Sequence, residues 1–381
     1  MTGATGAAPS GQDLRFSLRL NNDLPVARFA ALAAAAEDAG FDQVWISHDL
    51  FWRSAPVLVA AAAAATTRIS LGIGIMNPYS EHPAELAMHA ATLQELSAGR
   101  FLLGLGAGAR EFLAWAGIDR PRPLAATRAA VLACRTLLGR GSPAADGVAL
   151  ATAADPAPNP AADPAGDPAP DPAADPAPDL ADDPAPDQLG WQPAARLRFD
   201  GPPVPIYLAA MGPRMLALAG ELADGVLGLS FPPERASAAA ALVRGGAEAA
   251  GRDPAAIDVP ACFWCSVDDD PERAARPLAE KLAYYGPSIS AVQLADAGLS
   301  PDDFVPAAAA LEAGDPATAR RLISDRMLRL GIAGDAAAVL ERCRGLVTSG
   351  ATHLSFGPPL GPDPVAAVGL LGRDVLPALR G

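Results

Sequence analysis

The order of hydrophobic runs along this chain of 381 residues constrains its fold more than any other feature. Short apolar runs rich in β-branched residues alternate with longer runs rich in Ala and Leu. A strand that is always followed by a helix pairs with the next strand in parallel, and eight such units close into a barrel. We therefore predict an α/β fold of the (β/α)₈ type, a TIM barrel, in one domain over residues 14–381.

The predicted strands are the eight short runs of this pattern: Leu14–Leu20, Gln43–Ser47, Ile69–Ile75, Phe101–Gly106, Pro205–Ala209, Val226–Ser230, Val259–Val267 and His353–Phe356. The predicted helices include the longer runs Val26–Ala39, Pro83–Leu96, Leu124–Leu138, Met215–Leu222, Glu234–Ala250 and Asp335–Thr348. An extra helical segment, from Tyr284 to Leu330, precedes the last helix–strand pair.

One internal segment breaks the pattern. Residues 142–190, between the fourth and fifth strands, repeat Asp-Pro and Ala-Pro and contain no aromatic residue, Lys, Arg or Glu. Such a composition buries too little apolar surface to offset chain entropy, so we predict a disordered insert that is dispensable for folding. We also expect residues 1–13 to form a flexible N-terminus.

Charge and hydropathy exclude several classes of function. The net charge is −14, and the insert carries ten of the aspartates, so we expect no nucleic-acid partner. No run of 18 apolar residues occurs, and we expect a soluble cytoplasmic protein with no membrane partner. Cys262 and Cys265 have metal-like spacing but lie in a predicted strand, where positions three apart face opposite sides. We interpret the four cysteines as buried structural thiols and predict no metal site.

The third predicted strand contains Gly72 and Gly74 in an otherwise β-branched run. Glycine weakens a strand, and it usually marks a bulge or the close approach of a ligand to the backbone. Two interpretations remain open, a bulge that serves a ligand and one that serves barrel packing alone.

Five segments together resemble the luciferase-like family of flavin- and deazaflavin-dependent oxidoreductases, most closely the coenzyme F-420-dependent branch that includes methylenetetrahydromethanopterin reductase. The segments read AEDAGFDQVWIS, LGIGIMNPYSEHPAE, ATLQELSAGRFLLGLGAG, VPIYLAAMGPRMLALAGELADGVL and GATHLSFGPPLGPD. The resemblance implies an enzyme that acts on a small molecule, with coenzyme F-420 or alternatively FMN as cofactor, assembled as a homodimer or higher homo-oligomer.

The resemblance also implies cofactor-binding residues. A non-prolyl cis peptide at Gly74–Ile75 supports the ring in relatives, and Asn77 matches a contact position. The segment Ala209, Ala210, Met211, Gly212, Pro213 and Arg214 corresponds to the contact with the cofactor phosphate and side chain. Gly212 lets the backbone approach, and a helix that starts at Pro213 directs N–H groups and a positive dipole end at an anion.

Four residues are candidates for catalysis. His48 and Asp49 end the second strand, where the family has an acid followed by His, so the types are kept but the order is reversed; which of the two faces the cofactor stays open. Arg19 stands where the reductase has an acid, and Ala109 replaces a second one. Glu111 is a possible substitute acid. From these departures we expect a substrate other than the reductase's own, with Arg19 favouring an anionic or carbonyl-bearing molecule.

Three functions remain open at this point. The first is hydride transfer with coenzyme F-420, and the second is an FMN-dependent monooxygenase. The third, from a different class, is a non-catalytic barrel that binds a cofactor or a partner, since fold alone does not fix function.

Overall fold

A computed structural model describes residues 14–139 and 194–381. The predicted flexible N-terminus, residues 1–13, and the predicted insert, residues 142–190, lie outside the described residues.

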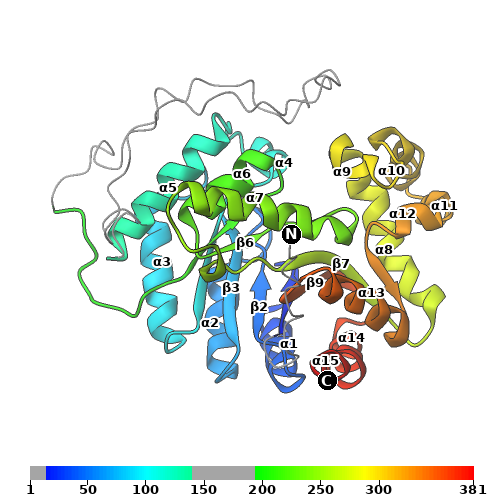
Figure 1. Ribbon diagram of the computed structural model, residues 1–381, viewed down its shortest axis with the longest axis horizontal. Coiled ribbons are helices and arrows are strands. Elements are labelled where there is room, and N and C mark those ends of the chain that lie inside the picture. The colour runs from blue at the N-terminus through cyan, green and yellow to red at the C-terminus, as the bar shows by residue number, and fades with distance from the viewer. Residues whose placement is uncertain (1–13, 140–193) are drawn as a thin grey trace, which may run out of the picture.

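All strand pairs of the sheet are parallel, and the sheet curls round on itself (Figure 1). Its order is β6-β5-β4-β3-β2-β1-β9-β7-β8. Two isolated parallel bridges, from Gly225 to Asp258 and from Leu229 to Cys262, join the β6 end of the sheet to the β7 region. The strands are β1 Arg15–Leu20, β2 Gln43–Ile46, β3 Ser70–Met76, β4 Phe101–Leu105, β5 Ile206–Ala209, β6 Gly225–Leu227, β7 Ala261–Val267, β8 Ile332–Gly334 and β9 His353–Leu360.

Helices surround this sheet. Those that follow the first six strands are α1 Val26–Asp38, α2 Ala55–Ala65, α3 Pro83–Leu96, α4 Arg110–Trp115, α5 Pro123–Leu137, α6 Pro213–Leu222 and α7 Ala236–Ala249. Those that follow β7 are α8 Pro271–Tyr285, α9 Ala291–Ala295, α10 Val305–Glu312, α11 Pro316–Leu322, α12 Asp325–Leu328, α13 Ala336–Thr348, α14 Pro364–Leu370 and α15 Leu376–Arg380.

The predicted barrel is confirmed, with one strand more than expected. All eight predicted strands are present, and β8 is the addition. It has only three residues, Ile332–Gly334, and it pairs with β7 through Cys265, Ser266 and Val267. β6 is equally short but lies within the predicted run Val226–Ser230, whereas β8 directly follows the predicted helical segment Tyr284 to Leu330 and has no separate apolar run.

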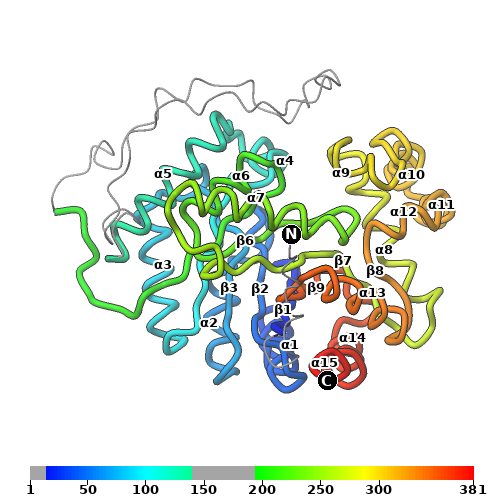
Figure 2. Tube along the Cα trace, in the orientation of Figure 1, coloured from blue at the N-terminus to red at the C-terminus, as the bar shows by residue number. Residues whose placement is uncertain are grey.

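The predicted extra helical segment, Tyr284 to Leu330, is also observed. It contains α9 to α12, which form a lobe beside the barrel, drawn in yellow and orange in Figure 1. The trace leaves the barrel through α8 and returns through β8 to α13 (Figure 2).

Of three apolar cores in the described residues, the two larger ones hold these parts together. The larger core lies between the barrel strands and the surrounding helices. The second lies under the lobe and contains Phe304, Leu278 and Leu282, together with Phe231 and Trp264 from the barrel side. Because Phe231 and Trp264 also line the main cavity, the second core supports one cavity wall.

At the amino ends of the strands, polar side chains fill the interior. The Asp258 carboxylate accepts hydrogen bonds from Arg15 Nη2 (2.7 Å) and from the Tyr207 hydroxyl (2.7 Å). It also lies 3.0 Å from Nδ1 of His353, which is fully buried. His353 therefore has a structural position at the amino end of the barrel.

No helix in residues 14–139 and 194–381 is both long and apolar enough to cross a membrane. The four cysteines are free and buried, which confirms their interpretation as structural thiols.

Candidate active site

A cavity of about 560 Å³ lies at the carboxyl ends of the strands. Its walls come from the ends of β1, β2, β3, β5 and β6, from the loop after β4, and from α8. This volume is within the range of small-molecule and cofactor pockets, and the carboxyl end of a barrel is where such enzymes bind their substrates.

The floor of the cavity is formed around Trp45, which is buried and donates a hydrogen bond from Nε1 to Gln43 Oε1 (2.8 Å). A Cβ atom at Gly72 would lie 2.2 Å from the Trp45 ring, and one at Gly74 would lie 2.7 Å from Leu227 Cδ1. Protein side chains therefore occupy the space that both glycines leave. Of the two interpretations of these glycines, barrel packing accounts for Gly72.

The predicted irregularity of β3 is nevertheless present. The pairing of β3 with β4 shifts register between Ile73 and Met76, and the Gly74–Ile75 peptide bond is cis as expected. Gly74 and Ile75 both line the cavity. Within β3, Gly72 therefore serves packing against Trp45, whereas Gly74 and Ile75 face the cavity.

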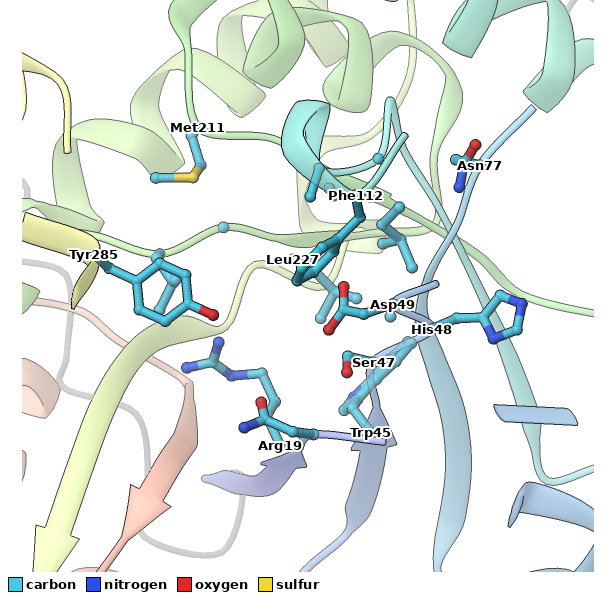
Figure 3. Close-up of a pocket in the computed structure, with 18 of the residues that line it drawn as sticks. Arg19, Trp45, Ser47, His48, Asp49, Asn77, Phe112, Met211, Leu227 and Tyr285 are labelled. Carbon is cyan, nitrogen blue, oxygen red and sulfur yellow. The ribbon is translucent and has the colours of Figure 1, made fainter. Parts of the chain in front are cut away.

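Asp49 and His48 point in different directions. In Figure 3 the Asp49 carboxyl group points into the cavity, and the His48 ring points away from its centre. The Ala55 N–H donates to His48 Nδ1 (3.2 Å), so the ring proton is on Nε2, which donates to Glu81 Oε1 (2.7 Å). Both ring nitrogens of His48 are therefore engaged, and the Asp49 carboxyl is the one available in the cavity.

A buried asparagine fixes the loop that carries Asp49. Asn22 Nδ2 donates to the carbonyl oxygens of Asp49 (3.0 Å) and Arg53 (2.8 Å). Asn22 Oδ1 accepts from the Ser47 hydroxyl (2.9 Å). Burial raises the pKa of Asp49, and Ser47 and His48 partly oppose this increase. A carboxyl group with a raised pKa in a cavity is suited to proton transfer.

Arg19 lies at the end of β1 and crosses toward β7 and β9. Its Nη2 donates to the carbonyl oxygen of Phe263 (2.7 Å), and its Nε donates to the Ser355 hydroxyl (3.0 Å). Burial lowers the pKa of Arg19. No ion pair joins Arg19 to a carboxylate of the described chain.

A second cation lines the same cavity. The Lys281 Nζ lies 5.1 Å from the centre of the Trp264 ring and 4.9 Å from that of Tyr285. Burial and the positive charge of Arg19 lower the pKa of Lys281 to about 8. Burial raises the pKa of Tyr285 to about 12, so its hydroxyl, which points into the cavity in Figure 3, stays protonated.

The predicted cofactor contacts divide into two groups. Asn77, Ala209, Ala210 and Met211 line the cavity. Asn77 Oδ1 accepts from the backbone N–H groups of the following turn (3.1 and 3.0 Å), which leaves its Nδ2 as the group for a ligand. The remaining three begin α6 beyond the cavity wall: Gly212, Pro213 and Arg214.

Gly212 caps α6 with its backbone alone, since no side chain accepts from the first N–H groups of this helix. A Cβ atom at Gly212 would meet no atom within 4 Å. The space in front of this helix end is thus open to an anionic group.

Glu111 is exposed in the first turn of α4 and does not line the cavity. The geometry therefore brings Asp49, Arg19, Gly74, Ile75 and Asn77 together and leaves Glu111 outside. In the described part of the chain no three His, Cys, Asp or Glu side chains are grouped to hold a metal ion.

Several cavity residues have no signal in a single sequence. Lys281 and Tyr285 lie on α8, far along the chain from the barrel strands that they face. The only available signal is that Lys281 is the one lysine beside 28 arginines. Asn22 holds the loop that carries Asp49, and Trp45 forms the cavity floor. Both roles depend on the buried position of these residues, which the sequence alone does not reveal.

Comparison with known proteins agrees with this geometry. Residues 6–353 match the family model described as luciferase-like monooxygenase. The chain is 30% identical over 369 residues to 5,10-methylenetetrahydromethanopterin reductase of Methanopyrus kandleri, covering 97% of this chain and 99% of the relative. It is 28% identical over 389 residues to an F-420-dependent glucose-6-phosphate dehydrogenase of Kineococcus radiotolerans, covering 97% and 98%.

Solved structures show the same architecture. The coenzyme F-420-dependent tetrahydromethanopterin reductase from Methanopyrus kandleri superposes with a TM-score of 0.76 at 27% identity, over 96% of this chain and 99% of the other. An F-420-dependent secondary alcohol dehydrogenase superposes with a TM-score of 0.67 at 19% identity, over 97% and 99%, which bears on the fold alone.

Proposed function

Because this chain belongs to the family of luciferase-like monooxygenases, we propose that it is an oxidoreductase that uses coenzyme F-420 for hydride transfer to or from a small organic substrate. The observation that carries the proposal is the Asp49 carboxyl group, which lies in the cavity together with Arg19 and Lys281. A titratable acid beside two cations is suited to proton-coupled redox chemistry and is unnecessary in a barrel that only binds a partner.

The cavity residues fit the cofactor. Gly74 and Ile75 line the cavity at the irregular stretch of β3, where a flat ring system can lie, and Asn77 Nδ2 remains available to donate to it. The open N-terminus of α6 at Gly212 suits an anionic group. Coenzyme F-420, when bound, supplies or accepts a hydride as a two-electron carrier.

The residues of the chain supply the proton and the charges. Asp49 gives a proton to the substrate atom that becomes an alcohol or amine, or takes it back in the reverse direction. Asn22 keeps the backbone at Asp49 in place, and so directs the carboxyl group into the cavity. Trp45, Leu227 and Phe112 are lining residues that exclude water from this region.

The substrate differs from that of the methanopterin reductase. Arg19 and Ala109, the two positions at which the resemblance implies lost acids, both line the cavity. Glu111 is outside it, so Asp49 is the acid we assign to the reaction. We expect no turnover of methylenetetrahydromethanopterin with reduced coenzyme F-420.

The test begins with the cofactor. Fluorescence titration of the purified protein should show binding of coenzyme F-420 and much weaker binding of FMN; the reverse order would favour a flavin monooxygenase. A substrate screen then follows F-420 absorbance. Asp49→Asn should lower kcat by roughly 10²- to 10⁴-fold with F-420 affinity unchanged.

Two further variants decide the assignment of the acid. Asp38→Asn is the matched control, since Asp38 is an exposed carboxylate that does not line the cavity. Full activity in Asp49→Asn together with loss in Glu111→Gln would transfer the role to Glu111.

The cellular setting belongs to the same proposal. We place the enzyme in the cytoplasm as a homodimer or higher homo-oligomer that acts on a small molecule, without nucleic-acid or membrane partners. Four buried free cysteines suit a reducing compartment, and a net charge of −14 opposes phosphate-backbone binding.

A further inference from the structure

The Arg19 guanidinium is held at one side of the cavity by neutral groups. Its hydrogen bonds run to Phe263 O, to Ser355 Oγ (3.0 Å) and to Ser355 O (3.3 Å). The lack of a side chain at Gly357 makes room for it, because a Cβ atom there would lie 2.5 Å from Arg19 Nη2. Its position is thus fixed by the fold, and its charge is not neutralised by an ion pair in the described chain.

Lys281 adds a second positive charge to the same cavity. Its ammonium group faces the Trp264 and Tyr285 rings and makes no ion pair within the described residues. The charged groups that act on it are Arg19, Asp23 and Asp49, and the Tyr285 ring lies beside it. The positive charge of Arg19 lowers the proton affinity of Lys281, and two half-buried cations in one cavity favour an anion that lies near both.

The charge balance of the cavity indicates which anion fits. The lining holds a third cation, Arg120, which donates to the Gly108 carbonyl oxygen (2.9 Å) in the loop after β4. On the side formed by β1, β2 and α8, Arg19 and Lys281 contribute two positive charges, and Asp49 contributes one negative charge when ionised. The sum on this side is one positive charge, which matches a monoanion. A phosphate dianion would leave a negative charge in a buried site, which is costly.

The cofactor's own anionic groups have a different place. The open helix end at Gly212 follows β5, and in the sheet order β5 is separated from β1 by three strands. Arg19 leaves β1 in the other direction, toward β9 and β7. The two cations thus belong to other elements of the cavity wall than the β5–α6 turn: Arg19 hydrogen-bonds to β7 and β9, and Lys281 lies on α8.

We propose that Arg19 and Lys281 form a subsite for a carboxylate group, and that the substrate of this enzyme is a small carboxylic acid in its anionic form. The inference rests on the proposed function, because it names the substrate class of the same cavity. Arg19 supplies a fixed guanidinium, Lys281 supplies the second charge, and the apolar rings around Lys281 accommodate the body of the molecule.

Binding is measured by calorimetry on the protein loaded with coenzyme F-420. The probes are acetate, propionate and benzoate, their neutral amides, and inorganic phosphate. We expect at least one carboxylate to bind and its amide to bind at least tenfold more weakly. Arg19→Gln and Lys281→Gln should each raise the carboxylate Kd at least tenfold and leave F-420 affinity unchanged. Arg128→Gln, which removes a surface partner of Glu221, is the matched control.

The pH dependence separates a direct contact from a structural effect. The ammonium of Lys281 loses its proton near pH 8, so the carboxylate Kd of the wild type should rise as pH increases through 8. Lys281→Arg stays charged, and its Kd should not rise in this interval.

Several results would overturn the inference. They are equal Kd values for a carboxylate and its amide, tighter binding of phosphate than of every carboxylate, or no binding of any carboxylate. A parallel loss of F-420 affinity in Arg19→Gln would assign the cations to the cofactor. If the protein binds no F-420 yet the unloaded protein binds carboxylates through Arg19 and Lys281, the proposed function fails and the subsite stands.

Discussion

At the scale of single residues, hydrogen-bond partners determine which of two neighbouring titratable groups is available for chemistry. His48 and Asp49 are adjacent in the chain, and the sequence predicted a site there without deciding between them. The Ala55 N–H and Glu81 occupy both nitrogens of His48, and Asn22 orients the loop so that Asp49 enters the cavity. The partners that occupy His48 lie seven and 33 residues further along the chain. The residues next to His48 and Asp49 therefore do not show which of the two side chains faces the cavity.

The Asp258 carboxylate gives a prediction at the same scale. Burial alone would raise its pKa, but the charge and hydrogen bond of His353, with Arg15 and Tyr207, lower it to about 2. Removing one partner of such a network leaves the others unpaired, so Asp258→Asn should cost about 3–5 kcal/mol of unfolding free energy in urea titrations. Asp269→Asn, at an exposed position, is the control and should change little.

The same group predicts an acid limit. A carboxyl group whose folded pKa is below its ordinary value stabilises the fold above that ordinary value, near 3.8. The stabilisation is lost as pH falls from about 4 to about 2. Wild-type melting temperature should therefore fall more steeply over this interval than that of Asp258→Asn. Equal slopes would contradict the prediction.

At the scale of elements, the sequence predicted every strand of the described sheet except β8, whose three residues directly follow the helical segment of the lobe. The cis bond at Gly74–Ile75 followed from the family resemblance, and the bulge of β3 from its glycines. The reason for Gly72, however, is the Trp45 ring of the neighbouring strand, a contact visible only in the structure. Lys281 and Tyr285 reach the cavity from α8, an element that the barrel pattern did not place.

The start of α6 gives the prediction for this scale. Gly212 has an extended backbone (φ −87°, ψ 155°) that valine also adopts, and its Cβ would enter open space. Gly212→Val should therefore leave the melting temperature unchanged, while it raises the F-420 Kd at least tenfold by blocking the helix end. Gly212→Ala should have an intermediate effect. Unchanged Kd values in a fluorescence titration would place the anionic group elsewhere.

At the scale of the whole molecule, two apolar cores are joined through the cavity wall. The lobe of α9 to α12 packs on Phe231 and Trp264, whose ring centres are 4.8 Å apart, and both residues face the cavity. The lobe is therefore part of the support for the cation side of the site, whereas the β3 and β5 side rests on the larger core.

Phe304 tests this division. It is fully buried in the second core, so Phe304→Ala should cost about 3–5 kcal/mol of unfolding free energy. Because Trp264 belongs to the same core, carboxylate affinity should fall more than F-420 affinity. Val305→Ala, at the exposed neighbouring position, is the control. Equal losses of both affinities would show that the two cores do not support separate sides of the cavity.

The contact between Gly357 and Arg19 has a consequence for how this site changes in evolution. The two residues belong to adjacent strands, β1 and β9, but stand at opposite ends of the chain. Any side chain at position 357 would displace the guanidinium, so arginine at position 19 is compatible only with glycine at position 357. In diverging descendants the two positions should covary, and a lineage that exchanges Arg19 for a smaller residue is then free to accept a side chain at position 357. A new substrate preference would thus be reached through paired mutations in a fixed order, with the loss of Arg19 first.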